Sequence, residues 1–250
     1  MKTVKETLLS RRSIRRYERR QLDPDQLLFI YDAIRNTPTS YNGQQFSVIA
    51  VTDQERKVEL AGIVGQKQVK TCALFLVFCA DFHKLNIAAS MEGIGQPRFQ
   101  DKIDGYTVGV IDAALAMGNA LVAAESMGLG TCCIGYTRTC DPGAIARFFA
   151  LPKGVAVVCG LAIGYPNEMP DLKPKLPRSL VVFGDRYRHD EEVMKEELRA
   201  YNEEVLRFNK QRSGGTTDNE WISHILDYHR EADGHNLEDA LKEQDFKIKM

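Results

Sequence analysis

Apolar residues in this chain follow two different periods, which predicts a fold that mixes helices and strands. Nearly continuous apolar runs at residues 71–80 and 154–164 are typical of strands covered on both faces. Shorter apolar segments predict strands at residues 46–52 and 131–134. Helical spacing predicts helices at residues 24–37, 54–64, 107–127, 142–149, 190–211 and 219–230.

Capping residues mark where the first helices begin and end. Thr3 followed by Glu6 predicts a capping box that opens a helix near the N-terminus. Asp23 suits an N-cap and Pro24 the first helical position, so the second helix is expected to begin there. This helix should end before Pro38, because a residue that precedes proline is pushed out of the α region.

The longest predicted helix, residues 107–127, is apolar over much of its circumference. Asp112, Asn119 and Glu125 interrupt the apolar run, which favours a closely packed core helix over a membrane span. The stretch before it, residues 85–105, loses periodicity and contains Gly95 and Pro97, so a mobile loop is expected there.

Composition and charge narrow the class of protein. With 250 residues and 44% hydrophobic content, the chain can bury a sizeable core. A formal net charge of −1 gives no electrostatic case for a nucleic acid or an anionic membrane as partner. The first six residues lack the apolar region of a secretion signal, which favours a cytoplasmic location.

The cysteines predict neither disulfides nor a metal site. Six are present, mostly within apolar runs, and none forms a C-x-x-C pair or falls at zinc-finger spacing from a histidine. We therefore expect buried, reduced thiols and no bound metal.

Two polar signatures flank the helix at residues 24–37. The first contains Arg11, Arg12, Ser13 and Arg15, whose guanidinium and hydroxyl groups suit a phosphate monoester. A solvated face at a helix end would have the same composition, and the residues alone leave both interpretations open.

The second signature lies after this helix and offers hydroxyl and amide groups around a turn. It contains Thr39, Ser40, Tyr41, Asn42 and Gln44, which suit hydrogen bonds to a flat polar ring or a sugar chain. An ordinary turn is the alternative. Because the two signatures flank one helix, they could meet at a single ligand.

No stretch has the dinucleotide-binding fingerprint of a Rossmann fold. The cluster Gly128-Leu129-Gly130 follows a helix and precedes a strand, which reverses the order that this motif requires. A nicotinamide-dependent enzyme with this sequence would therefore need another binding surface for its cosubstrate.

The order and spacing of these motifs resemble the FMN-dependent nitroreductase family over nearly the whole chain. The similarity lies with the NADPH nitroreductase and flavin reductase branch, whose members carry a long C-terminal extension. The segments that carry it are Arg11-Arg12-Ser13-Ile14-Arg15, Pro38-Thr39-Ser40-Tyr41-Asn42-Gly43-Gln44, Gly65-Gln66-Lys67, Ala123-Ala124-Glu125-Ser126-Met127-Gly128-Leu129-Gly130, Ile134-Gly135, Gly164-Tyr165-Pro166 and Asp171-Leu172-Lys173-Pro174-Lys175-Leu176-Pro177.

The resemblance implies an α+β fold with a central, mostly antiparallel sheet flanked by helices. It implies that the long central helix lies at a homodimer interface. It also implies an FMN-binding core at residues 1–188 and a helical C-terminal extension at residues 189–250. The acidic segment at residues 237–250 departs from the family ending, and the sequence assigns it no function.

Cofactor-binding roles follow residue by residue from the resemblance. The expected FMN phosphate ligands are Arg11, Ser13, Arg15 and Lys175. Ser40 and Gln66 are expected around the ribityl chain and ring, Lys173 near the pyrimidine edge, and the backbone of Ile134 and Gly135 near the flavin N5. The partner subunit is expected to supply Tyr41 and Asn42, and the other expected cofactor-binding residues are Arg12, Thr39 and Gln44. Arg212 matches an arginine that contacts the 2′-phosphate of NADPH in relatives.

Two departures from the family pattern bear on these roles. Lys175 replaces an arginine, which keeps the charge but loses the forked geometry. Thr216, Thr217 and Asp218 stand where further basic residues are expected, so the choice between NADPH and NADH stays open.

The predicted activity is a two-electron, ping-pong NAD(P)H oxidoreductase that reduces nitroaromatics, quinones or free flavin. The chemistry belongs to the cofactor, so no catalytic side chain is assigned. Alternatives are a flavin-dependent reductase of an azo compound, disulfide or metal oxyanion, and an FMN-binding carrier or sensor. The sequence leaves the physiological acceptor and any proton donor open.

Overall fold

The structure, a computed structural model, describes residues 1–232 and 236–248. These residues form two compact units. The first contains Met1–Met169 together with the segment that begins at Asn236, and the second begins at Pro170. The boundary expected from the resemblance, after residue 188, stays a prediction.

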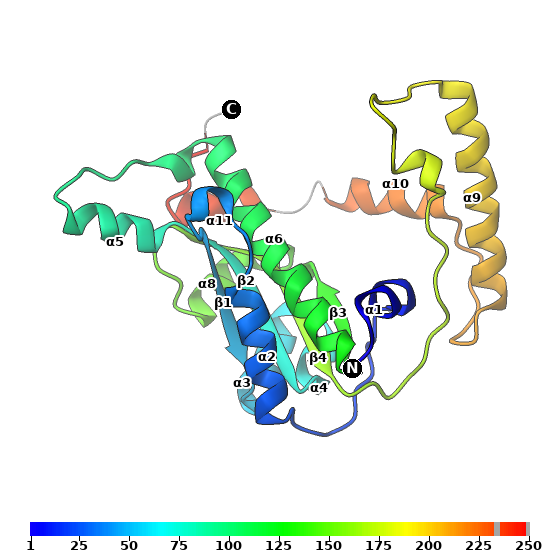
Figure 1. The fold of residues 1–250 in the computed structure, drawn as a ribbon, viewed down its shortest axis with the longest axis horizontal. Helices are drawn as coiled ribbons and strands as arrows, with labels where there is room; N and C mark the ends of the chain where they lie inside the picture. Colours follow the sequence, from blue (N-terminus) through cyan, green and yellow to red (C-terminus); the bar gives the residue numbers. More distant parts are fainter. Residues whose placement is uncertain (233–235, 249–250) are drawn as a thin grey trace. The chain divides into compact units, whose positions relative to one another are not determined.

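A four-stranded antiparallel sheet forms the centre of the first unit, as Figure 1 shows. The strands lie in the order β1-β2-β4-β3, and each neighbouring pair is antiparallel. Their bounds are β1 Phe46–Val51, β2 Leu74–Asp81, β3 Gly130–Ile134 and β4 Val155–Gly164. The α+β class with an antiparallel sheet and a long central helix is thereby confirmed.

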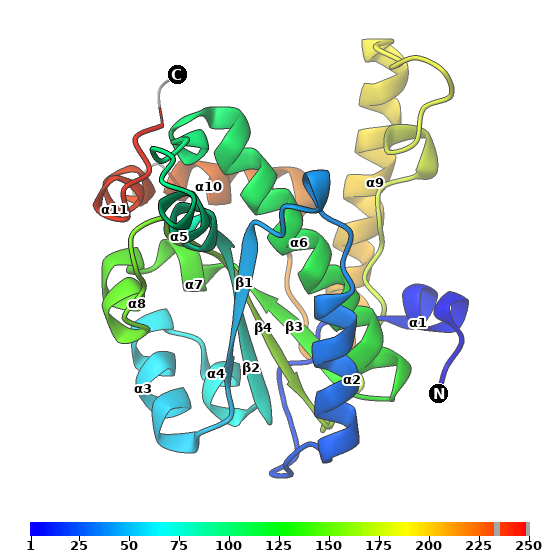
Figure 2. The same cartoon turned by 60° about the vertical axis from the view of Figure 1, so that its left-hand side comes forward.

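Helices cover both faces of this sheet, so that the unit has three layers (Figure 2). One face packs against α2 (Pro24–Arg35) and α6 (Ile103–Ser126). The other packs against α3 (Gln54–Val64), α4 (Lys67–Thr71) and α8 (Pro142–Phe148). Every residue of β2 is buried, because alternate side chains enter the two cores and both faces are covered.

The predicted helix starts are confirmed. At α1 (Val4–Ser10) the Thr3 hydroxyl accepts from the Glu6 N–H, and the Glu6 carboxylate accepts from the Thr3 N–H in return. Asp23 is the N-cap of α2, and its N–H donates to the Gln26 side chain at 3.0 Å. These caps satisfy backbone donors that the helices leave free.

The expectation of a loop throughout residues 85–105 is wrong. Helix α5 occupies His83–Met91, a short 3-10 helix η2 occupies Phe99–Asp101, and α6 begins at Ile103. None of the residues of α5 is buried. A helix that buries no face shows no clear apolar period, which is the signal that the sequence lacks here.

Helix α6 is long and apolar enough to cross a membrane by length and composition. Its alanine-rich face is instead buried against the sheet, where Ala113, Ala116 and Ala120 are fully covered. This burial identifies α6 as a core helix, in agreement with the prediction. Ile103, Ile111 and Leu115 remain exposed on its other side.

The second unit is built around α9 (Glu191–Gln211) and α10 (Trp221–Glu231). The two helices meet through Tyr201 and Trp221, whose ring centroids lie 5.4 Å apart. The Asn202 amide also donates to the Glu220 carboxylate at 2.9 Å. Another 3-10 helix, η3 (Arg178–Leu180), precedes α9.

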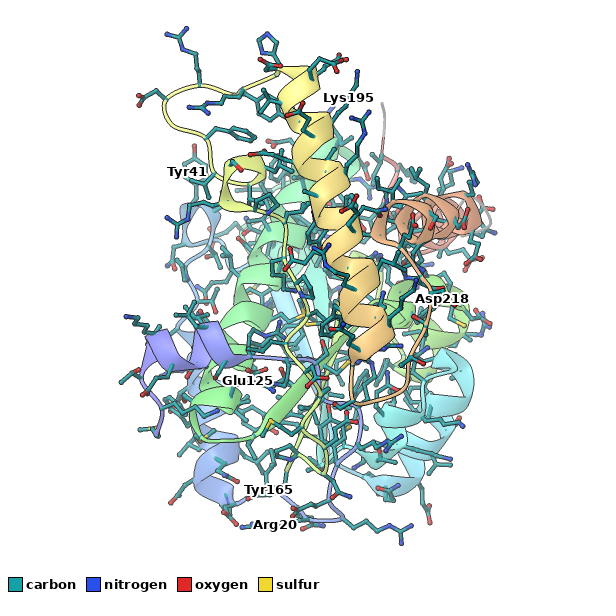
Figure 3. All side chains as sticks on the ribbon, turned by 90° about the vertical axis from the view of Figure 1, so that its right-hand side faces the viewer. Arg20, Tyr41, Glu125, Tyr165, Lys195 and Asp218 are labelled. Atoms are coloured by element: carbon teal, nitrogen blue, oxygen red, sulfur yellow. The ribbon has the colours of Figure 1, made fainter. Side chains whose placement is uncertain are left out.

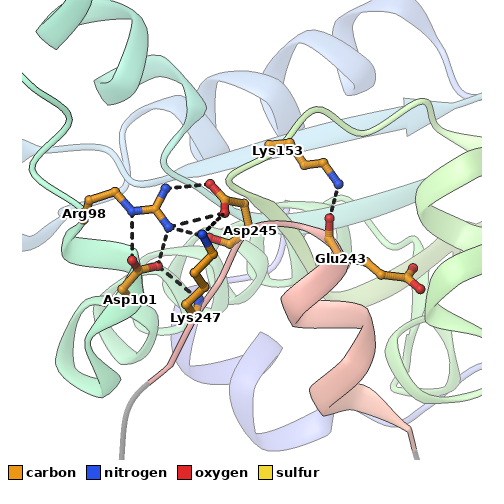
Figure 4. A network of polar contacts seen from close by, with 6 residues as sticks. All are labelled: Arg98, Asp101, Lys153, Glu243, Asp245 and Lys247. Carbon is orange, nitrogen blue, oxygen red and sulfur yellow. Dashed lines mark hydrogen bonds and ion pairs between the residues drawn. The ribbon is translucent and has the colours of Figure 1, made fainter.

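The C-terminal segment returns to the first unit through α11 (Leu237–Glu243). Phe246 is buried there between the rings of Phe82 and Tyr106. Figure 4 shows polar contacts of the C-terminal segment, in which Arg98 donates to the carboxylates of Asp101 and Asp245. The acidic segment that the sequence left unassigned therefore fastens the region between α5 and α6.

The six cysteines are free thiols, but the expectation that they are buried holds only in part. Cys72, Cys79 and Cys132 are buried, while Cys133 and Cys140 are exposed. Cys133 lies on the opposite face of β3 from the buried Cys132 and Ile134, because successive side chains of a strand point to opposite faces.

Candidate active site

The first signature lies along the edge of the sheet, beside β3. Ser13 pairs with Thr131 in a parallel bridge, and the Ile14 N–H donates to the Thr131 carbonyl at 2.8 Å. The approach requires Gly130, because a Cβ at this position would lie 2.7 Å from Cγ1 of Ile14. This pairing with β3 fixes the backbone between Arg12 and Arg15.

Arg11 lies next to a buried carboxylate from the last turn of α6. Its Nε is 3.6 Å from Oε1 of Glu125, which is an ionic contact and too long for a hydrogen bond. The same carboxylate oxygen accepts a 2.5 Å hydrogen bond from the Thr131 hydroxyl. Burial raises the pKa of Glu125, and the hydroxyl and Arg11 oppose this shift.

The other arginines of the signature differ in their contacts. Arg12 Nε donates to the Ser10 carbonyl at 3.3 Å. The backbone N–H of Arg15 donates to the Glu168 carboxylate at 2.5 Å, while its side chain is exposed. Within residues 1–232 and 236–248, the Arg15 guanidinium has no ion pair.

The second signature forms a strained turn. Tyr41, Asn42 and Gln44 have φ values of 52°, 54° and 52°, in the left-handed region that non-glycine residues rarely occupy. Local bonds support the turn, since the Thr39 hydroxyl accepts from the Gln44 N–H at 3.2 Å. Strain of this kind is concentrated at binding and catalytic sites.

A second carboxylate of α6 holds this turn. Asp112 is buried, and its two oxygens accept from the N–H groups of Ser40 and Gln45, each at 3.2 Å. Seven residues further along the helix, the Asn119 amide donates to the Thr37 hydroxyl at 2.9 Å. Figure 3 shows Tyr41 pointing outward near one end of α6 and Glu125 at the other.

The three polar residues of α6 were missed as site residues by sequence reasoning. They were noted only because Asp112, Asn119 and Glu125 interrupt an apolar helix. A buried charge needs a partner, and this need was the available signal. Both signatures are therefore anchored to one helix.

The remaining predicted contacts of the first unit lie at ends of elements. Gln66 is the N-cap of α4, and its side-chain oxygen accepts from the Gln68 amide at 2.8 Å. Ile134 is the buried last residue of β3. Gly135 follows as the N-cap of the short helix α7 (Tyr136–Thr139) and is exposed.

Three predicted residues belong to the second unit. Lys173 and Arg212 line the same cavity of about 190 Å³, together with Trp221 and His224. Arg212 Nε donates to the Gly215 carbonyl at 2.6 Å, which orders the turn after α9. Lys175 is exposed on the extended segment before η3.

The donor set of the first signature fits a phosphate group. The Arg11 Nε is buried without a hydrogen-bond partner, and Ser13 adds a hydroxyl beside it in the sequence. The rest of the guanidinium offers forked donors of the kind that bind an anionic ligand. Among the described residues, no group of three or more His, Cys, Asp or Glu could hold a metal ion.

Comparison with known proteins decides the family. A model of the nitroreductase family matches residues 8–165, and a model of the C-terminal domain of the nitroreductase family matches residues 173–249. The chain belongs to the nitroreductase family. The resemblance inferred from the motifs is thereby confirmed, and the protein is an oxidoreductase.

Relatives in the family align over most or all of the chain. An FMN reductase [NAD(P)H] of Bacillus subtilis is 33% identical over 249 residues, which cover 99% of each chain. An oxygen-insensitive NADPH nitroreductase of Salmonella typhimurium is 35% identical and covers 88% of each chain. The structure of the hypothetical oxidoreductase YcnD from Bacillus subtilis superposes with a TM-score of 0.94 at 33% identity, over 100% of both chains.

Proposed function

We propose that this protein is an FMN-dependent oxidoreductase that takes two electrons from NAD(P)H and passes them to a small acceptor. The acceptor class is nitroaromatic compounds, quinones or free flavin. The observation that carries the proposal is the arginine signature on the edge of β3, where the buried Arg11 Nε has no hydrogen-bond partner within the described residues. Two relatives named for FMN and nitro-compound reduction support the acceptor class.

In this proposal the chain's own residues bind and orient. Arg11, Arg12, Ser13 and Arg15 bind the FMN phosphate. The turn contributes Thr39, Ser40 and Gln44 to the ribityl chain and ring, beside Gln66, Ile134 and Gly135. When bound, FMN supplies the hydride chemistry, so no side chain is required as a nucleophile.

The second unit contributes the contacts that the resemblance implies. Lys175 is proposed to bind the phosphate and Lys173 the pyrimidine edge, while Arg212 binds the nicotinamide cosubstrate. The shared cavity of Lys173 and Arg212 supports a ligand-binding role for this unit. Lys175 provides charge without a fork, so we expect its contribution to be the smaller of the phosphate contacts.

We further propose a homodimer in which Tyr41 and Asn42 reach the partner's cofactor. Tyr41 is fully exposed on a turn that Asp112 holds in place. Ile103, Ile111 and Leu115 form exposed apolar surface on α6, which is the kind of surface that a subunit interface covers. Sedimentation should give twice the monomer mass of 28.2 kDa, and a monomer would contradict this assembly.

The visible spectrum of the purified protein, followed by anaerobic titration with NADPH and separately with NADH, tests the activity. We expect a flavin spectrum that either nucleotide bleaches, and the more effective nucleotide identifies the preferred donor. Bound flavin that neither nucleotide reduces would favour a carrier or sensor. A colourless protein that does not bind added FMN would overturn the proposal.

A further inference from the structure

Glu125 occupies a position that is unfavourable for a carboxylate. It lies in the last turn of α6, where the carbonyl ends of the helix are partly negative, and that turn contains no basic residue. Its side chain is only 8% exposed, so the charge is also desolvated. A buried charge of this kind is weak evidence for a purely stabilising role.

The contacts of Glu125 point to the first signature. Its one ion pair within residues 1–232 and 236–248 is with Arg11. Its carboxylate is fixed in orientation by the Thr131 hydroxyl, and the Thr131 carbonyl accepts from the N–H of Ile14 in the signature. The end of α6, strand β3 and the signature are thus linked through one carboxylate.

This geometry determines how the guanidinium of Arg11 is turned. A guanidinium is a planar fork, so fixing its Nε toward Glu125 also fixes where its two terminal nitrogens point. In the described part of the chain, the one ion pair of this guanidinium runs through Nε, and its terminal nitrogens make none of their own. They are therefore available to an anion outside the protein.

We infer that Glu125 is a positioning residue for the cofactor phosphate, which turns the Arg11 guanidinium toward it without touching the cofactor itself. The inference rests on the proposed function, because it requires FMN at the first signature. It assigns a different role to each carboxylate of α6. Glu125 acts on the phosphate end through a side chain, and Asp112 acts on the turn at residues 40–45 through backbone N–H groups.

The test compares FMN with riboflavin, which has the same ring and ribityl chain but no phosphate. Binding of each to flavin-free protein is measured by quenching of flavin fluorescence. Glu125→Ala should weaken FMN binding roughly 10-fold, as is typical when a group that orients a ligand is removed. Riboflavin binding should be unchanged, so the preference for FMN should fall by the same factor.

Two further variants keep the test independent of folding. Glu125→Gln keeps the size of the side chain and can still accept from Thr131, so it should fold normally and still lose most of the preference for FMN. Asp112→Asn should affect the two flavins equally, because it acts on the turn and not on the phosphate. The wild-type protein provides the reference ratio of FMN to riboflavin affinity.

Each alternative result has a definite meaning. If the Glu125 variants weaken FMN and riboflavin equally, the residue is structural and the inference is overturned. Unchanged binding of both flavins, or an Asp112→Asn variant that loses the FMN preference in the same way, would also overturn it. A wild-type protein that binds neither flavin would overturn the proposed function as well, and this separates the two failures.

Discussion

Two arginines at opposite ends of α6 show how different the surroundings of the same side chain can be. Near the first turn, Arg98 donates to Asp101 at 2.8 and 2.9 Å and to Asp245 at 2.6 Å. Beside the last turn, the one ion pair of Arg11 within the described residues is a 3.6 Å contact with Glu125. The Arg98 guanidinium is hydrogen-bonded to protein carboxylates, whereas most N–H donors of the Arg11 guanidinium remain available to a ligand.

This difference separates a structural arginine from one available to a ligand. The Arg98 cluster fastens the C-terminal segment to the region before α6, and further bonds run from the Lys247 N–H to Asp101 and from the Gly154 N–H to the Gln244 carbonyl. The Arg11 Nε has an ionic contact with Glu125 but no hydrogen-bond partner among the described residues. An unsatisfied buried donor costs free energy, and a bound anion beside the guanidinium would offset part of that cost.

The largest effect is expected from Phe246→Ala, which tests the structural end of α6. Phe246 is 1% exposed between Phe82 and Tyr106, so truncation should lower the free energy of unfolding by about 3–5 kcal/mol. Urea unfolding measures this loss, and the ratio of FMN to riboflavin affinity should not change. Lys242→Ala, at an exposed position of α11, is the control, and a loss below about 1 kcal/mol for Phe246→Ala would contradict tight docking of this segment.

A smaller effect is expected from Arg98→Ala. The variant removes charge-assisted hydrogen bonds to two carboxylates, which should lower the free energy of unfolding by about 2 kcal/mol. Arg98→Lys keeps a charge but loses the fork, so it should recover only part of this loss. An altered FMN preference in Arg98→Ala with intact folding would break the distinction between the two arginines.

The smallest expected effect is the change with pH in the stability contributions of Asp245, beside Arg98, and Glu125, beside Arg11. Hydrogen bonding from Arg98 lowers the pKa of Asp245 below its usual 3.8, so its stabilising contribution is present above that pH and is lost as the pH falls further. Burial raises the pKa of Glu125 above 4.5, so the wild type loses stability relative to Glu125→Gln as the pH rises through the raised value.

Urea unfolding of Asp245→Asn, Glu125→Gln and wild type between pH 3 and 7 measures both trends. The advantage of wild type over Asp245→Asn should grow with pH, while its difference from Glu125→Gln should move in the opposite direction. Parallel trends for the two variants would show that the carboxylates do not differ in the way that the contacts indicate.

The sequence predicted the sheet, most helix bounds and both signatures, because each depends on local periodicity or on adjacent polar residues. Asp23 and Pro24, for example, are sufficient to start α2. Helix α5 was missed, since it buries no residue and so leaves no apolar period. The docking of Phe246 was also missed, because its partners Phe82 and Tyr106 are distant in the sequence.

The anchors of the candidate site could not be assigned from sequence for the same reason. Asp112 and Glu125 were visible as polar residues in an apolar helix, but Asp112 finds Ser40 at a separation of 72 residues. Only the packing of α6 against the sheet brings each carboxylate to its signature. The sequence shows that a buried residue is polar, but the residue with which it pairs depends on how the chain folds.

The most direct test of the difference between the two arginines is the affinity of Arg11→Ala for FMN and for riboflavin. We predict FMN binding weaker by roughly 10–100-fold, from the loss of charge-assisted hydrogen bonds to phosphate. Riboflavin binding should change little, whereas the free energy of unfolding should fall, because the buried Glu125 carboxylate loses its one ion pair within the described chain. Unchanged FMN affinity, or an equal loss for both flavins, would contradict the assignment of Arg11 to the phosphate.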